Sequence, residues 1–332
     1  MEIAAPYRPP PAGLPVLWHA DLRPRFVVFV DTEEEFDWRA PFTRERHGTQ
    51  ATRALPAAHR RFAGWGVPIA YMVDYPVVRD PHAVEALHAA LADGASTIGA
   101  QLHAWVTPPF NEPLSPAASY AGNLPLNVEA AKLDSLTQAL HATFGRRPRA
   151  YRAGRYGIGA NTLGLLAERG YRLDSSVRAH YDYRGDGGPD FRDMGNAAYR
   201  CGPGDALIEL PLTTVFTGAL RRMGAPLFHR LGRVPHARGA FARAGLLERV
   251  SLTPEGMPLP AVLEAVRVAL GEGLPVLSFA FHSPSLAPGH TPYVRDAADL
   301  AAFWRWWEGV LTLLDARGVK PIGLEALIDA VG

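Results

Sequence analysis

The stretch FVVFVDTEEEF, residues 26–36, decides the fold assignment. Its first five residues are apolar and three of them are β-branched, which predicts a buried strand. The strand runs directly into acidic residues, since five carboxylates fall within the seven positions from Asp31 to Asp37. So many like charges after a buried strand indicate either a solvated loop or a site that takes a cation.

Seven further segments have the composition of strands, and helical patterns separate several of them. The predicted strands besides 25–31 are PIAYMVD (68–74), STIGAQLH (96–103), RAYRAG (149–154), YRLDSSV (171–177), ALIELP (206–211), PVLSFAFH (275–282) and VKPIG (319–323). The predicted helices lie at about 80–94, 127–144, 161–169, 260–271 and 295–317. Alternation of this kind is typical of parallel strands joined by crossover helices, so the sequence predicts an α/β fold with about eight strands.

The chain length favours one large domain over two, because 332 residues is ordinary for a single α/β barrel. We expect residues 1–24, which begin with a proline-rich tract, to be an N-terminal extension, and 25–332 to be the single domain. Residues 178–205 and 212–259 are rich in Gly, Arg and Pro and fit no clean period. We expect them to be long loops or an inserted subdomain that covers a site.

Composition narrows the range of partners. Lys and Arg number 34 against 33 Asp and Glu, so a net charge of +1 provides no field that would gather nucleic acid or an anionic membrane. A single cysteine, Cys201, excludes an intramolecular disulfide and a cysteine-based zinc site. No signal-peptide pattern and no apolar run of membrane-spanning length is visible, so the sequence predicts a cytoplasmic protein that does not enter the membrane. The oligomeric state stays open.

Polar residues stand at the carboxyl ends of most predicted strands, where parallel α/β proteins bind their ligands. These residues are Asp31, Asp74, His103, Arg152, Asp174 and His282. If the strands close into a barrel, all six face one rim. Carboxylates and histidines gathered there predict a metal site or an acid–base site.

Five segments, in order, resemble the motifs of the NodB-like polysaccharide deacetylases, carbohydrate esterase family four. They are FVVFVDTEEEF (26–36), TIGAQLHAWVTPP (97–109), YRAGRYG (151–157), LDSSV (173–177) and SFAFHSPSLAPGHTPYV (278–294). The resemblance covers most of the chain. It implies a distorted (β/α) barrel with seven or eight parallel strands, which agrees with the strand count. It also implies a hydrolase that removes N-acetyl groups from a carbohydrate.

The same resemblance implies roles for the strand-end residues. Asp31 would be the general base, and His282 the general acid that protonates the leaving amine. Glu33 and His103 would be ligands of a divalent metal, with zinc the expected ion. Arg152 would orient Asp31, because its guanidinium can hold a carboxylate in place.

Four further residues have less specific roles. Asp174 is expected either to hold His282 or Arg152, or to make a cap or turn. The aromatic residues Trp105, Tyr156 and Tyr293 follow strand ends in loops rich in proline or glycine, so they are candidate contacts for a sugar ring. Ordinary anchoring of a loop explains them equally well.

The second motif departs from the family pattern. The common form has two histidines four residues apart, and Thr107 occupies the second position here. A neutral hydroxyl is a poor zinc ligand, so either Asp74 or Gln101 completes the site, or the metal binds weakly, or the site lacks a metal. The remaining acids of the first motif are expected to be solvated or to cap helices: Glu34, Glu35 and Asp37.

Three functions therefore stay open. The first is a metal-dependent deacetylase acting on a sugar polymer or glycan precursor. The second is a catalytically altered deacetylase-like barrel that binds glycan or serves in an assembly. The third is a hydrolase of a non-sugar amide. Glycine-rich phosphate loops, Gly-x-Ser-x-Gly elbows and Cys-x-x-Cys pairs are missing, so nucleotide-dependent, serine-hydrolase and zinc-finger functions have no support.

Overall fold

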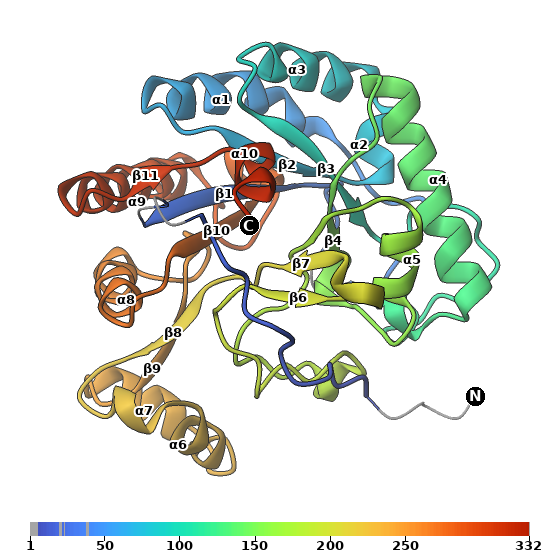
Figure 1. Cartoon of the computed structure of the whole chain (residues 1–332). Helices are drawn as coiled ribbons and strands as arrows, with labels where there is room; N and C mark the ends of the chain where they lie inside the picture. Colours follow the sequence, from blue (N-terminus) through green and yellow to red (C-terminus); the bar gives the residue numbers. More distant parts are fainter. Residues whose placement is uncertain (1–5, 20–21, 23, 38–39, 332) are drawn as a thin grey trace.

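A mostly parallel, curled sheet forms the centre of the molecule (Figure 1). The structure is a computed structural model, and it describes residues 6–19, 22, 24–37 and 40–331. The strands follow the order β10-β1-β2-β3-β4-β5-β7-β6, and β11 also pairs with β1. The parallel strands are β1 (Arg25–Thr32), β2 (Ile69–Val73), β3 (Thr97–Leu102), β4 (Ala150–Ala153), β5 (Leu173–Asp174), β7 (Leu207–Glu209), β10 (Val276–His282) and β11 (Lys320–Pro321). The antiparallel edge strand is β6 (Tyr199–Cys201). The predicted distorted barrel of seven or eight parallel strands is confirmed.

Helices pack around the outer face of the sheet (Figure 1). They are α1 (Leu55–Gly64), α2 (Tyr75–Arg79), α3 (Pro81–Leu91), α4 (Leu126–Phe144), α5 (Thr162–Glu168), α8 (Leu259–Gly271) and α9 (Ala297–Ala316). Side-chain caps fix where two of them begin. The Asp80 side chain accepts the backbone N–H of His82 at the start of α3. The Asp296 side chain accepts the backbone N–H groups of Ala298 and Asp299 at the start of α9. All five predicted helices are present, whereas α1 and α2 were not predicted.

The strand β1 is buried on both faces, which explains its unbroken apolar sequence. Phe26, Val28 and Val30 belong to the core between the sheet and the helices. Val27 and Phe29 belong to a second core inside the barrel. Because both faces are covered, no polar residue interrupts the strand until Asp31.

The amino ends of the strands are closed by the two ends of the chain. The short helix α10 (Leu324–Asp329) places Leu324, Leu327 and Ile328 in the core inside the barrel, and Val16 of the N-terminal segment joins them. We call these four residues the barrel floor. Residues 1–5, 20, 21 and 23 of the predicted N-terminal extension lie outside the described residues.

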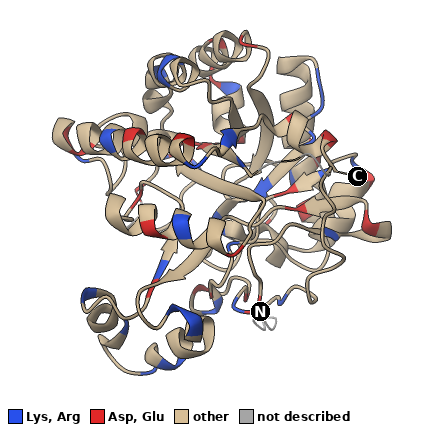
Figure 2. Ribbon diagram, turned by 60° about the vertical axis from the view of Figure 1, so that its left-hand side comes forward, with Lys and Arg blue, Asp and Glu red and all other residues tan. Residues whose placement is uncertain are grey.

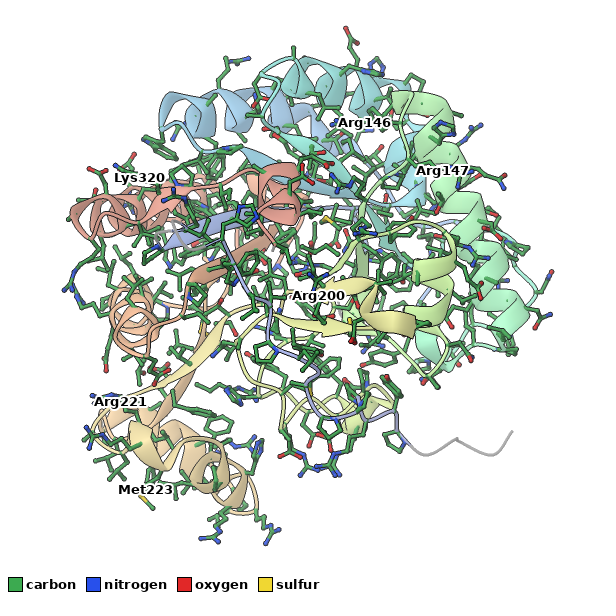
Figure 3. All side chains as sticks on the ribbon, viewed as in Figure 1. Arg146, Arg147, Arg200, Arg221, Met223 and Lys320 are labelled. Atoms are coloured by element: carbon green, nitrogen blue, oxygen red, sulfur yellow. The ribbon has the colours of Figure 1, made fainter. Side chains whose placement is uncertain are left out.

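The predicted irregular segment 212–259 contains regular structure. Its strands β8 (Thr214–Thr217) and β9 (Glu248–Ser251) pair antiparallel, and between them lie α6 (Gly224–Leu231) and α7 (Ala237–Arg243). We call these four elements the lobe, which projects from the barrel (Figure 1). Arginines are conspicuous on it (Figure 2), and Arg221 and Met223 point outward from it (Figure 3).

The base of the lobe bridges the gap in the barrel between β7 and β10. Leu252 donates its backbone N–H to Thr213 O at 3.0 Å, and Ala280 of β10 donates to Leu252 O at 3.2 Å. The lobe is therefore attached at the carboxyl-end rim, next to the predicted site. Among the described residues, no helix has the length and apolar character needed to cross a bilayer.

Candidate active site at the carboxyl ends of the strands

A cavity of about 320 Å³ opens at the carboxyl ends of the strands. Eight of the nine predicted site residues line it: Asp31, Glu33, His103, Trp105, Arg152, Tyr156, His282 and Tyr293. The ninth, Asp174, does not. Acids of β1 and the residues that follow it thus face imidazoles from the ends of β3 and β10 across one cavity.

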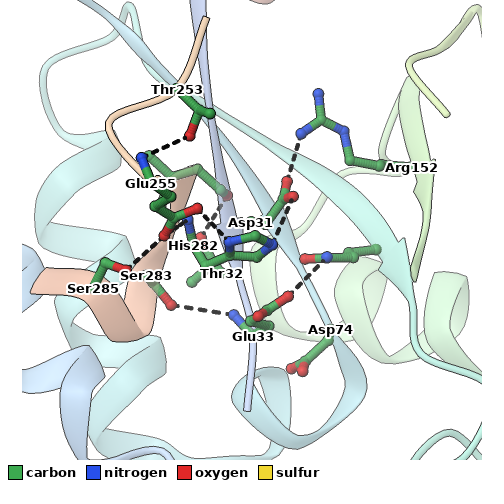
Figure 4. A network of polar contacts seen from close by, with 12 residues as sticks. Asp31, Thr32, Glu33, Asp74, Arg152, Thr253, Glu255, His282, Ser283 and Ser285 are labelled. Atoms are coloured by element: carbon green, nitrogen blue, oxygen red, sulfur yellow. Dashed lines mark hydrogen bonds and ion pairs between the residues drawn. The ribbon is translucent and has the colours of Figure 1, made fainter. Parts of the chain in front are cut away.

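Arg152 of β4 holds Asp31 at the end of β1. Its Nη1 donates to Asp31 Oδ1 at 2.7 Å (Figure 4), and both side chains are buried. The guanidinium is itself fixed, because Nε and Nη2 donate to the carbonyl oxygen and to Oγ of Ser175, each at 3.0 Å. The arrangement leaves Asp31 Oδ2 directed toward His282, whose Nε2 lies 3.8 Å away.

His282 is oriented by a residue that the sequence did not indicate, Glu255. Its Nδ1 lies 2.6 Å from Glu255 Oε2, and its backbone N–H donates to Glu255 Oε1 at 3.1 Å (Figure 4). Ser285 Oγ donates to the same Oε1 at 2.5 Å. Burial lowers the pKa of His282, but the negative charges of Glu255 and Glu33 outweigh burial and raise that pKa to about 10. Glu255 belongs to no motif, so only its fold position reveals it.

His103 lies between two consecutive glutamates. Its Nε2 is 3.4 Å from Glu33 Oε2 on the cavity side, and its Nδ1 is 2.6 Å from Glu34 Oε2 on the buried side. The expectation that Glu34 is a solvated residue or a cap is wrong. Asp74 Oδ2 accepts the Glu34 backbone N–H at 2.7 Å, which anchors this segment inside the protein and leaves Glu34 fully buried.

The other two acids of the first motif lie outside this cluster. Glu35 is half-buried, and its Oε1 accepts the backbone N–H of Ala51 in the turn before α1. Asp37 is exposed. Both observations agree with the expectation of solvated or capping residues.

The two candidate replacements for the missing ligand occupy different places. Gln101 Nε2 lies 3.0 Å from Glu33 Oε2 and 3.3 Å from His103 Nε2, and Gln101 lines the cavity. Asp74 caps α2 instead, because its Oδ1 accepts the backbone N–H of Val77 at 2.9 Å. Asp74 approaches only the other ring nitrogen, with Oδ2 3.9 Å from His103 Nδ1. Gln101 is therefore the replacement that shares the cavity with Glu33.

Thr107 takes no part in the cavity wall. It follows His103 by one turn, with its backbone N–H donated to His103 O at 3.1 Å, and it is fully buried. Its carbonyl oxygen accepts from Lys132 Nζ at 2.7 Å. Among the described residues its Oγ1 has no hydrogen-bond partner.

The acid cluster around His103 fits a divalent cation. Of the buried oxygens that lack a hydrogen-bond partner among the described residues, three belong to the acid and amide groups next to His103: Glu33 Oε1, Glu34 Oε1 and Gln101 Oε1. Burial raises the pKa of Glu33 to about 7 and that of Glu34 to about 8, because a buried environment disfavours the charged carboxylate. Carboxylate and amide oxygens with an imidazole are a donor set that zinc and similar ions accept.

Two positions around His103 could hold such an ion. Glu34, Asp74 and His103 offer ligand atoms that lie within 4.8 Å of one another, but only His103 of these three lines the cavity. Glu33, Gln101 and His103 Nε2 all face the cavity. A substrate therefore reaches only the second position, and the pair Glu34–Asp74 supports His103 from behind, as outer carboxylates commonly do for metal-binding histidines.

Asp174 lies behind the cavity wall. Its carboxylate accepts a hydrogen bond from Ser176 Oγ, and it faces Glu209 across the β5–β7 pairing. Burial raises the pKa of Asp174 to about 6. Asp174 forms no direct hydrogen bond with His282 or Arg152, so it does not hold either of them directly. It fixes the side chain of Ser176 instead. Ser176 Oγ in turn accepts the backbone N–H of Ala153 at 2.8 Å.

The three predicted aromatic residues all line the cavity but differ in exposure. Trp105 is only 2% exposed, and its ring stacks on that of His103 with centroids 4.3 Å apart. Tyr156 stacks on Tyr183 at 5.8 Å. Tyr293 is 38% exposed. Trp105 therefore packs against the histidine, whereas Tyr293 presents most ring surface to a ligand.

Solved structures provide the comparison with known proteins, since no family model and no curated protein matches the chain. A candidate polysaccharide deacetylase from Mycobacterium smegmatis superposes with a TM-score of 0.56 and 20% sequence identity, over 96% of this chain and 94% of that one. The chain shares the fold of that protein. A GH57-type branching enzyme from Pyrococcus horikoshii is less similar, with a TM-score of 0.48 and 11% identity over 92% of this chain and 70% of that one. The chitin deacetylase of Colletotrichum lindemuthianum has a TM-score of 0.43 and 12% identity over 97% of this chain and 93% of that one.

Proposed function

We propose that the protein is a metal-dependent hydrolase that removes an N-acetyl group from a sugar polymer or glycan precursor. The observation that carries the proposal is the single cavity in which Asp31, Glu33, His103 and His282 meet. It combines a carboxylate held by arginine, an imidazole held by glutamate, and a set of donors for a cation. These are the parts that hydrolysis of an amide by water requires.

Asp31 is the general base. Arg152 occupies Oδ1, so Oδ2 is the atom that takes a proton from the attacking water. The fixed guanidinium holds the carboxylate in one orientation, with Oδ2 free of the arginine.

His282 is the general acid. Glu255 engages Nδ1, so Nε2 is the atom that donates a proton to the leaving amine. Its raised pKa, about 10, means that the imidazole carries that proton at neutral pH. The 3.8 Å separation of Nε2 from Asp31 Oδ2 places acid and base on the same reacting group.

Glu33 and His103 Nε2 would hold the divalent ion, and Gln101 would complete the set through its amide oxygen. When bound, the ion would supply Lewis-acid polarisation of the acetyl carbonyl. Glu34 accepts from His103 Nδ1 and thereby directs Nε2 toward the cavity.

A second candidate function is a glycan-binding or assembly protein without hydrolysis. The Gln101 amide favours this second function, because its Nε2 lies within hydrogen-bond distance of both Glu33 Oε2 and His103 Nε2, the two atoms that would bind the ion. A non-sugar N-acyl substrate is compatible with the same chemistry.

Metal content and acetate release separate these candidates. Purified protein should bind close to one equivalent of zinc or cobalt and release acetate from chitooligosaccharides only when the metal is present. Asp31→Asn should keep the metal and lower the rate by about a hundredfold or more, the usual contribution of a general base. A protein that binds oligosaccharide but releases no acetate with any divalent metal would contradict hydrolysis of these substrates.

Three variants test whether Glu33 and His103 bind the metal ion. Glu33→Gln and His103→Ala should each lose metal in equilibrium dialysis, because both remove a donor on the cavity side. Thr107→Val is the control and should retain the metal, since Thr107 does not line the cavity. Equal metal loss in all three variants would contradict the assignment.

A further inference from the structure

Three arginines line the cavity, and they differ in how their charge is balanced. Arg152 is paired with Asp31 at 2.7 Å, and Arg155 lies 3.6 Å from Asp186. Among the described residues, no carboxylate is within ion-pair distance of Arg178. One positive charge in the cavity wall is therefore without a counter-ion.

Arg178 is held in place by neutral groups. Its Nε and Nη2 donate to Ser251 Oγ of β9 at 3.3 and 3.1 Å. Its guanidinium lies 3.8 Å from the ring centroid of Tyr181 and 5.6 Å from that of Tyr156. Aromatic faces and a hydroxyl fix the direction of the fork and leave its charge available to a ligand.

The neighbouring carboxylates of the cavity are engaged elsewhere. Glu255 binds His282 and Ser285, and Asp31 binds Arg152. Tyr156 lies against Arg178 on one side and also lines the cavity with Asp31 and His282. The acids Asp31 and Glu33 thus lie at the end of β1, where the reaction would occur, while Arg178 lies on the side of the cavity near the base of the lobe.

We infer that Arg178 binds an anionic substituent, a carboxylate or a phosphate, on the substrate. That the bound molecule is a substrate for deacetylation rests on the proposed function, whereas the binding of an anionic group by Arg178 does not. A buried or partly buried guanidinium is costly to leave unpaired, and the flat fork matches both anions with two parallel hydrogen bonds. The preferred substrate is therefore an N-acylated sugar that carries negative charge rather than a neutral chitin-like chain.

Three oligosaccharides of equal length test the inference: neutral N-acetylglucosamine, a form with N-acetylmuramic acid and a form with N-acetylglucosamine 6-phosphate. Metal-loaded wild-type protein should bind at least one anionic form about tenfold more tightly than the neutral one, by calorimetry, and show the same preference in kcat/KM. Arg178→Gln should abolish the preference, and Arg178→Lys should restore part of it. Which anionic form is preferred distinguishes carboxylate from phosphate.

Arg249→Gln is the matched control. Arg249 also lies over the ring of Tyr181, 3.5 Å from its centroid, but it does not line the cavity, so the preference should persist in that variant. A purely structural role of Arg178 would weaken all three ligands equally and leave the ratio unchanged, which would overturn the inference. Failure to bind either anionic form would also overturn it.

The two proposals fail separately. Hydrolysis of the neutral form with no anionic preference would support the deacetylase and contradict the role of Arg178. Anion-selective binding that Arg178→Gln abolishes, without acetate release, would support Arg178 and contradict the deacetylase.

Discussion

At the scale of single residues, the proposed base and acid are held by partners that lie far away in the chain. Asp31 depends on Arg152, and His282 depends on Glu255. Strand-end position and motif resemblance were sufficient to predict that Asp31, Arg152 and His282 lie at one rim of the barrel, where all three line the cavity. Glu255 was not predictable, because it lies in an irregular segment and only the packing of the lobe base against β10 brings it to the imidazole.

Replacing Glu255 with glutamine tests its effect on His282. The neutral amide removes the largest influence that raises the pKa of His282, so that pKa should fall. Since the proposed acid works in its protonated form, the alkaline limb of the kcat/KM profile should move to lower pH, with a loss of about tenfold or more at pH 8. Ser285→Ala keeps the charge of Glu255 and should leave the limb near its wild-type position. An unmoved limb in Glu255→Gln would show that Glu255 does not tune the acid.

At the scale of elements, long amphipathic helices and two-sided buried strands were predictable because their periodicity is strong. The shortest elements were not. The segment predicted as a strand over 171–177 contains only the two-residue strand Leu173–Asp174. Beyond it, the side chains of Ser175 and Ser176 accept hydrogen bonds from Arg152 and from the backbone of Ala153. The sequence does not decide between long loops and an inserted subdomain for the lobe, because its helices are short and rich in Arg and Gly, which weakens any helical pattern.

The helix α4 contains a buried carboxylate that makes stability depend on pH. Burial raises the pKa of Glu129 from 4.5 to about 7, and Thr162 Oγ1 donates to its Oε1 at 2.5 Å. The folded state therefore holds the proton more tightly than the unfolded state. The stabilising effect of protonation is complete below pH 4.5 and is lost as pH rises through 7, by roughly 3 kcal/mol at most.

Glu129→Gln should remove this dependence. Relative to wild type, the free energy of unfolding of the variant should rise steadily between pH 5 and pH 8, measured by urea denaturation. Glu168→Gln is the control on the neighbouring helix α5, where the side chain is 73% exposed, and it should change stability little at either pH. A constant difference between Glu129→Gln and wild type would contradict a raised pKa.

At the scale of the whole molecule, the residues that close the barrel and the residues of the candidate site lie at opposite ends of the strands. The barrel floor and α10 seal the amino ends of the strands, while the cavity opens at the other end. The sequence predicted the barrel and the rim of polar strand ends. It did not predict that both ends of the chain pack at the floor, because short apolar segments such as those around Val16 and Leu327 show no diagnostic period.

Truncating the floor should destabilise the protein without altering the site. Leu327 is fully buried, so Leu327→Ala should lower the free energy of unfolding by about 2–5 kcal/mol. Leu126→Ala is the control, since Leu126 is 54% exposed, and it should cost much less. Metal affinity of folded Leu327→Ala should match wild type; a large loss would mean that the floor and the cavity are coupled.

The most direct test of the central claim is the position of a bound ion, measured by anomalous diffraction at the zinc edge from crystals grown with zinc. The proposed site predicts one peak on the cavity side of His103, about 2.0–2.2 Å from Nε2 and from a Glu33 oxygen, with the Gln101 amide turned so that its oxygen faces the ion. A peak beside Nδ1 between Glu34 and Asp74, or fully loaded crystals without a peak in the cavity, would contradict it.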